Sequence, residues 1–119
     1  MIESVAASAK RFSQGGYEVF VDGVITPNFL TSWIKIAEEG IDVRYIVLRP
    51  SEQITVTRAS EREQNIYYPL ESEVVRKVWN FFSELGKYES HSIDTSTHTV
   101  DESATLIEKN LHEGSFRII

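Results

Sequence analysis

The sequence predicts an α/β protein, a three-layer αβα arrangement in which a parallel sheet of three to four strands lies between helices. The first observation is a strand, helix and strand pattern within residues 19–48, because this spacing is typical of a right-handed βαβ crossover between parallel strands. The second is that short apolar runs alternate with helical stripes along the rest of the chain, as in α/β proteins.

Length and composition favour one globular domain, residues 1–119. The chain is 41% hydrophobic and 25% charged, near the globular average. It contains no cysteine, so disulfides and thiolate chemistry are excluded. A net charge of −6 argues against nucleic-acid binding. The longest apolar run is far too short for a membrane span, so we expect no membrane partner and a cytoplasmic location.

The first half of the chain should supply two helices and two strands. Apolar residues at helical spacing predict a helix over 2–14, which Gly15 and Gly16 end. The run 19–21 is expected to be a short buried strand. The next helix should have Thr26 as N-cap and Pro27 as its first residue and end at Gly40. The nearly continuous apolar run 43–48 predicts a strand covered on both faces.

The second half should supply three helices and a third strand. A helix is expected from Glu52, followed by a polar, arginine-bearing segment over about 58–70 that fits a lid. The stripe over 74–85 is the strongest helical pattern and predicts core. The last elements are a strand within 91–96, a helix over 100–113 behind a capping box formed by Thr99 and Glu102, and a tail, 116–119, that is an edge strand or a loose end.

Asp22 is the first candidate functional residue. It comes directly after the apolar run 19–21, and ligands of α/β sheets bind at the carboxyl ends of strands. A carboxylate there can hold a metal ion or its water. The alternative is that Asp22 and Gly23 form a turn that closes the strand. The residues alone favour neither interpretation.

Histidine and serine residues carry weaker signals. His91, His98 and His112 do not have the spacing of a zinc site. Ser92, Ser96 and His98 could form a nucleophile and base, but the chain has no Gly-x-Ser-x-Gly turn to support them. Neither kind of site is expected.

Four segments in order resemble the carboxyl-terminal two thirds of a small P-loop kinase of the AAA-type ATPase group, which includes chloramphenicol phosphotransferase and shikimate, gluconate and adenylate kinase relatives. The resemblance covers about residues 2–113. The segments that carry it are 15–24 (GGYEVFVDGV), 45–50 (YIVLRP), 58–62 (RASER), and 93–96 (IDTS) with the helix that follows.

The resemblance implies ATP and Mg²⁺ as cofactors and a small-molecule phosphate acceptor. Asp22 resembles the Walker B-type acid, which holds Mg²⁺ through water. Arg58 and Arg62 resemble lid arginines that neutralise the transferring phosphoryl group and, with Asp22, are the implied catalytic residues. Nucleotide contacts are implied for Arg58 and for the loop that lines the adenine pocket, Asp94, Thr95 and Ser96. The acceptor would lie near Val24, Ile25, Pro27 and Phe29.

The chain departs from this family in one essential part, because it contains no Gly-x-x-x-x-Gly-Lys-Ser/Thr phosphate loop. Such an incomplete P-loop fold should not transfer phosphate alone. The missing strand would lie between the strand ending at Asp22 and the strand ending at Leu48. A gap in mid-sheet leaves unpaired edges, so we expect an oligomer, a strand exchange, or a partner that supplies the missing strand and loop.

Two other interpretations remain open. The chain could be a non-catalytic interaction module or oligomerising scaffold that has the kinase framework without its phosphate loop. A flavodoxin-like domain is less favoured, because Arg58 and Arg62 would then have no role as a lid.

Overall fold

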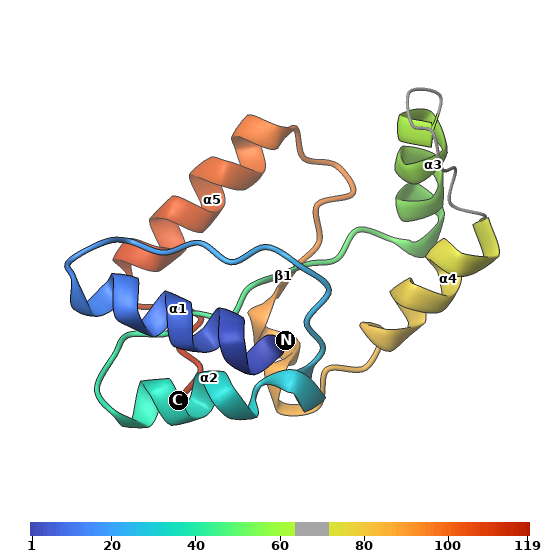
Figure 1. Ribbon diagram of the computed structural model, residues 1–119. Coiled ribbons are helices and arrows are strands. Elements are labelled where there is room, and N and C mark those ends of the chain that lie inside the picture. Colours follow the sequence, from blue (N-terminus) through green and yellow to red (C-terminus); the bar gives the residue numbers. More distant parts are fainter. Residues whose placement is uncertain (64–71) are drawn as a thin grey trace. The chain divides into compact units, whose positions relative to one another are not determined.

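The computed structural model describes residues 1–63 and 72–119 (Figure 1). It divides into unit 1, residues 1–45 and 115–119, and unit 2, residues 46–114. The elements in chain order are α1 (Ile2–Gln14), the 3-10 turn η1 (Pro27–Phe29), α2 (Thr31–Glu38), β1 (Val47–Leu48), α3 (Glu52–Glu63), α4 (Ser72–Phe81), the 3-10 helix η2 (Gly86–His91), β2 (Ser92–Ile93) and α5 (Val100–His112).

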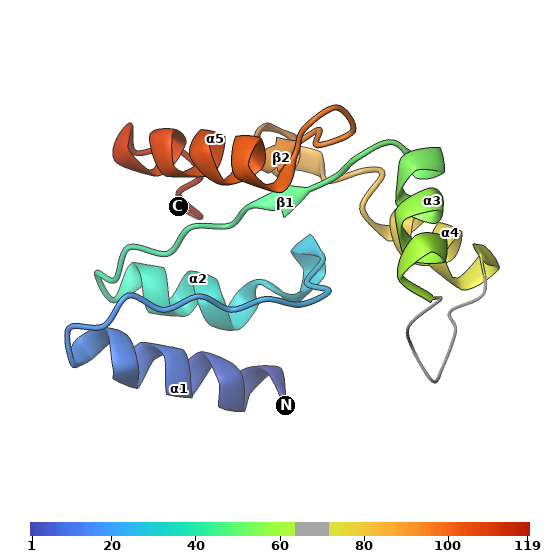
Figure 2. The ribbon, with the colours of Figure 1, turned by 90° about the horizontal axis from the view of Figure 1, so that it is seen from above.

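The described residues contain a single two-stranded sheet, so the predicted three-layer αβα fold with three to four strands is wrong. β1 and β2 run parallel, with Val47 opposite Ser92 and Leu48 opposite Ile93. The run 19–21 forms neither a strand nor a helix, and its residues are exposed. Strand propensity depends on a partner to pack and bond against, and this run has none among the described residues. The fold is mainly helical (Figure 2).

Unit 1 is built from α1, α2 and the carboxyl-terminal tail. The two helices pack against each other and lie side by side in both views (Figures 1 and 2). Leu30, at the start of α2, is the largest side chain that is fully buried. The tail pairs in antiparallel fashion with the chain around Arg44: Tyr45 N donates to Phe116 O (2.9 Å), and Ile118 N donates to Val43 O (3.0 Å).

That pairing corrects two expectations about the ends of unit 1. The predicted strand 43–48 is reduced to Val47 and Leu48, because residues 43–45 bond to the tail instead of to the parallel sheet. The tail is therefore not a loose end.

The helix predicted from Pro27 begins later than expected. A 3-10 turn over Pro27–Phe29 precedes α2, and Thr26 makes no side-chain cap.

Unit 2 contains the parallel strands and three helices. α3 begins at Glu52 as predicted and packs against α4 (Figure 1). The indole Nε1 of Trp79 donates to Pro50 O (2.9 Å), which ties α4 to the chain that leads into α3. The stripe over 74–85 was predicted to be core, and Leu85 at its end is buried. The stripe residues within α4 are only half-buried or, like Val74 at 45%, exposed, so the prediction holds for them only in part.

The capping box of α5 is confirmed and makes a direct prediction about stability. Thr99 Oγ1 accepts from Glu102 N (3.1 Å), and Glu102 Oε1 accepts from Thr99 N (3.0 Å). We expect Thr99→Ala to lower the free energy of unfolding by about 1 kcal/mol, because it removes an N-cap. Urea unfolding followed by circular dichroism measures this. Thr97→Ala, at an exposed position of the same loop, is the control and should change little; equal losses in both variants would contradict a cap effect.

Candidate functional site

The polar residues that follow the two parallel strands meet at one edge of unit 2. Parallel strands end at the same edge of a sheet, so the residues after β1 and those after β2 are neighbours. The backbone N–H of Ser51 donates to Ser96 Oγ (2.8 Å) and joins the two loops. We call this group the strand-end cluster; its members are Arg49, Ser51, Arg58, Asp94, Thr95 and Ser96.

Arg58 reaches this edge from α3. Its Nη2 donates to Thr95 O (2.9 Å) and Ser96 O (3.3 Å), and its Nη1 donates to Thr95 Oγ1 (3.4 Å). Thr95 is buried, so the guanidinium lies against a loop that is itself held in the unit. The Nε of Arg58 has no hydrogen-bond partner among residues 1–63 and 72–119. The structure thus joins Arg58 to Thr95 and Ser96, residues for which the resemblance implied nucleotide contacts.

Asp94 shapes the loop after β2. Its Oδ1 accepts from the Ser96 hydroxyl (2.5 Å) and from the Ser96 backbone N–H (2.9 Å), which is an Asx turn. Both bonds lower the pKa of the Asp94 carboxyl, because they stabilise its charged form. The bond from the Ser96 hydroxyl has the larger effect, and the bond from the backbone N–H has the smaller one. Asp94 therefore presents a carboxylate that is fixed in direction and exposed to solvent.

Arg49 is the residue of the cluster that sequence reasoning missed. It directly follows β1, and its guanidinium binds Glu89 through two bonds, Nη1 to Oε1 (3.1 Å) and Nη2 to Oε2 (2.9 Å). Nη1 also donates to Phe82 O (2.8 Å). The side-chain bond to Arg49 is the main cause that lowers the pKa of Glu89 to about 2, and the Leu85 N–H adds to it. The signal in the sequence that could have indicated Arg49 is its position between a predicted strand and Pro50.

The first turn of α3 completes the edge. Ser51 Oγ accepts from Ile54 N (3.3 Å) and so caps the helix at its N-terminus. Helix N-termini carry partial positive charge, and the guanidinium group of Arg58 adds a full charge, whereas that of Arg49 is paired with Glu89. Such a combination suits the binding of phosphate or another anion.

The remaining predicted site residues lie elsewhere. Asp22 is exposed in unit 1, within a stretch that is neither helix nor strand, so it does not follow a strand end as expected. Arg62 is exposed in the last turn of α3. Of the predicted lid, 58–63 belong to α3, and 64–70 lie outside the described residues. Val24 and Phe29, predicted near an acceptor, are exposed in unit 1, whereas Ile25 and Pro27 are half-buried.

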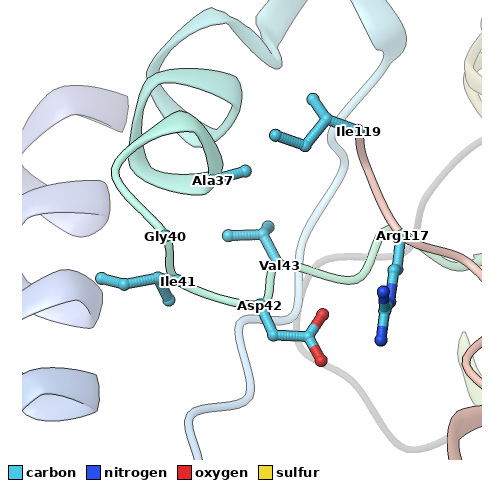
Figure 3. A pocket seen from close by; sticks show the side chains of 7 residues that line it. All are labelled: Ala37, Gly40, Ile41, Asp42, Val43, Arg117 and Ile119. Carbon is cyan, nitrogen blue, oxygen red and sulfur yellow. The ribbon is translucent and has the colours of Figure 1, made fainter.

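Unit 1 has a shallow depression of about 250 Å³ (Figure 3). Its walls include Ala37, Val43 and Ile119, and the side chains of Asp42 and Arg117 lie at its rim. Arg44 binds both oxygens of Asp42 (2.6 and 2.8 Å), and this hydrogen bonding lowers the Asp42 pKa. The carboxylate is thus already paired with an arginine of the same unit.

Among residues 1–63 and 72–119, no three His, Asp or Glu side chains form a group that could hold a metal ion. No helix in this described part of the chain is both long and apolar enough to cross a membrane. Comparisons of the sequence with models of known protein families and with curated proteins found no match.

Proposed function

We propose that the chain is a nucleotide-binding module of P-loop kinase lineage, which holds ATP at the strand-end cluster and does not transfer phosphate alone. The observation that supports this most is the contact between Arg58 and the loop of Thr95 and Ser96. These two segments are 37 residues apart, and the resemblance assigned both to the same nucleotide. Their meeting at a strand end is the arrangement that a nucleotide site in such a protein requires.

The chemistry of the cluster fits the phosphate groups of a nucleotide. Arg58 and Arg49 supply guanidinium groups, and the capped start of α3 lies between them in sequence. Mg²⁺ would enter the site bound to the phosphate oxygens, so the protein would have to supply only one or two carboxylate ligands. The same proposal includes a small molecule as the phosphate acceptor and a partner segment that supplies the phosphate loop.

Titration with Mg-ATP by calorimetry tests this function through Arg58. We expect binding in the micromolar range, and we expect Arg58→Ala to weaken it by about tenfold to a hundredfold, because a charge-assisted contact is lost. Arg76→Ala is the matched control. Arg76 lies on α4 of the same unit and pairs with Glu52 (3.0 Å), so its loss should leave ATP binding unchanged.

Arg58 also holds the loop after β2, so its two roles must be separated. Arg58→Lys keeps a positive charge but cannot repeat the forked contact with two carbonyl oxygens. We expect it to retain more ATP affinity than Arg58→Ala at equal thermal stability. No binding up to millimolar Mg-ATP, or equal binding by all variants, would overturn the proposed function.

A further inference from the structure

An unusually apolar surface lies in unit 1, in the segment 17–24, which we call the apolar segment. Its large side chains are exposed: Tyr17 to 67%, Val19 to 39%, Phe20 to 85%, Val21 to 40% and Val24 to 67%. Single exposed apolar residues are ordinary, but a contiguous group of this kind marks an interaction surface.

Most of the backbone of the apolar segment makes no hydrogen bond to the residues that the structure describes. Tyr17 N donates to Phe12 O (3.2 Å) at one end, and Ile25 O accepts from the Tyr45 hydroxyl (2.6 Å) just beyond the other. Between these anchors, residues 18–24 make no backbone hydrogen bond to any part of the chain that the structure describes. Figure 1 shows the segment as an extended trace. An extended chain of this kind presents a row of N–H and C=O groups to another strand.

The residue types favour strand pairing. Tyrosine, valine and phenylalanine are strong strand formers. The segment contains Tyr17 and then, after Glu18, the run Val19, Phe20 and Val21. Side chains alternate along an extended chain, so Tyr17, Val19 and Val21 share one face. Glu18, Phe20 and Asp22 share the other.

The charges of the apolar segment determine which partner strand can pair with it. Glu18 and Asp22 flank Phe20, and no lysine or arginine occurs between Arg11 and Lys35. Pairing with the same segment of a second copy, antiparallel and centred on Phe20, would place Glu18 opposite Asp22, and like charges in that position destabilise a sheet. A strand with basic residues at the same spacing would instead pair with both carboxylates.

We propose that the apolar segment binds an extended segment of a partner protein by strand addition. The partner segment carries apolar residues at alternate positions and, on its other face, two lysine or arginine residues four positions apart. Main-chain hydrogen bonds would supply affinity, and the charges would select the partner. This inference rests on unit 1 alone and is independent of the nucleotide site proposed in unit 2.

The test uses the full chain and a synthetic nine-residue probe, Thr-Val-Lys-Val-Thr-Val-Lys-Val-Thr, with blocked ends; its two lysines are four residues apart, like Glu18 and Asp22. We expect calorimetry to give a Kd of about tens of micromolar, and hydrogen exchange to show protection of residues 18–24 when the probe is bound. A probe with glutamate in place of both lysines should bind at least about tenfold more weakly. A probe methylated at alternate backbone nitrogens should not bind, because it cannot form the ladder.

Charge reversal in the protein makes the test sharper. Glu18→Lys/Asp22→Lys should exchange the preference, so that the glutamate probe binds more tightly than the lysine probe. Glu61→Lys/Glu84→Lys is the matched control: both positions are exposed in unit 2, and each double variant changes the net charge from −6 to −2. Its preference should remain that of the unchanged chain.

Two results would overturn the proposal. One is equal affinity for the lysine and glutamate probes, or no binding of either, because strand addition selected by charge requires a difference. The other is a dimer in light scattering that Phe20→Ser abolishes, since a second copy would then cover the segment. An unchanged monomer with the expected probe preference supports a basic partner strand.

Discussion

Leu30→Ala should strongly destabilise unit 1. Leu30 is 2% exposed and lies where the 3-10 turn passes into α2. Removing three buried carbons costs the lost transfer free energy and leaves a cavity, together about 2 to 5 kcal/mol. Small domains have total stabilities of about 5 to 15 kcal/mol, so this loss is a large share.

Urea unfolding monitored by circular dichroism measures the effect, and Leu48→Ala is the matched control. The chemical change is the same, but Leu48 is 51% exposed. We expect the control to cost under about 1 kcal/mol, because little apolar surface returns to water. If the two variants lose equal stability, the burial of Leu30 is not what supports unit 1.

Arg49→Ala should have the second large effect, in unit 2. The variant loses the two-bond pair with Glu89 and leaves Phe82 O without its 2.8 Å donor. From these hydrogen bonds we expect a loss of about 1 to 2 kcal/mol. Arg76→Ala is again the control, because the pair of Arg76 with Glu52 is exposed and such pairs contribute about 0 to 1 kcal/mol.

The pH dependence of this effect follows from Glu89. Its pKa is lowered from 4.5 to about 2, so the pair with Arg49 stabilises the folded state fully above about pH 4.5. As the pH falls from there through about 2, Glu89 takes up a proton and this stabilisation disappears. The stability difference between the unchanged chain and Arg49→Ala should therefore be constant from pH 7 to 5 and shrink at pH 3. A difference that stays constant down to pH 3 would contradict the role of Glu89.

Helices were predicted well because their signals are local. The bounds of α1 were correct, α3 begins at the predicted Glu52, and the Thr99 and Glu102 cap of α5 was read from two residues. A helix satisfies its backbone hydrogen bonds within its own sequence, so spacing and caps carry most of the information.

The resemblance assigned Arg58 and residues 94–96 to one nucleotide, and the structure joins Arg58 to Thr95 and Ser96; nucleotide binding there stays a prediction. Arg49 was missed, since its partner Glu89 is 40 residues away in sequence. Asp22 was assigned to the end of a strand that the described fold does not contain.

The sequence by itself determined the bounds of α1, the start of α3, the cap of α5 and which residues favour strands. Only the tertiary structure decided which apolar runs became strands. Residues 47–48 pair with β2, and residues 43–45 bond to the carboxyl-terminal tail. Residues 19–21 pair with no other segment of the described chain. The physical reason is that a strand completes its hydrogen bonds and buries its faces only against another segment.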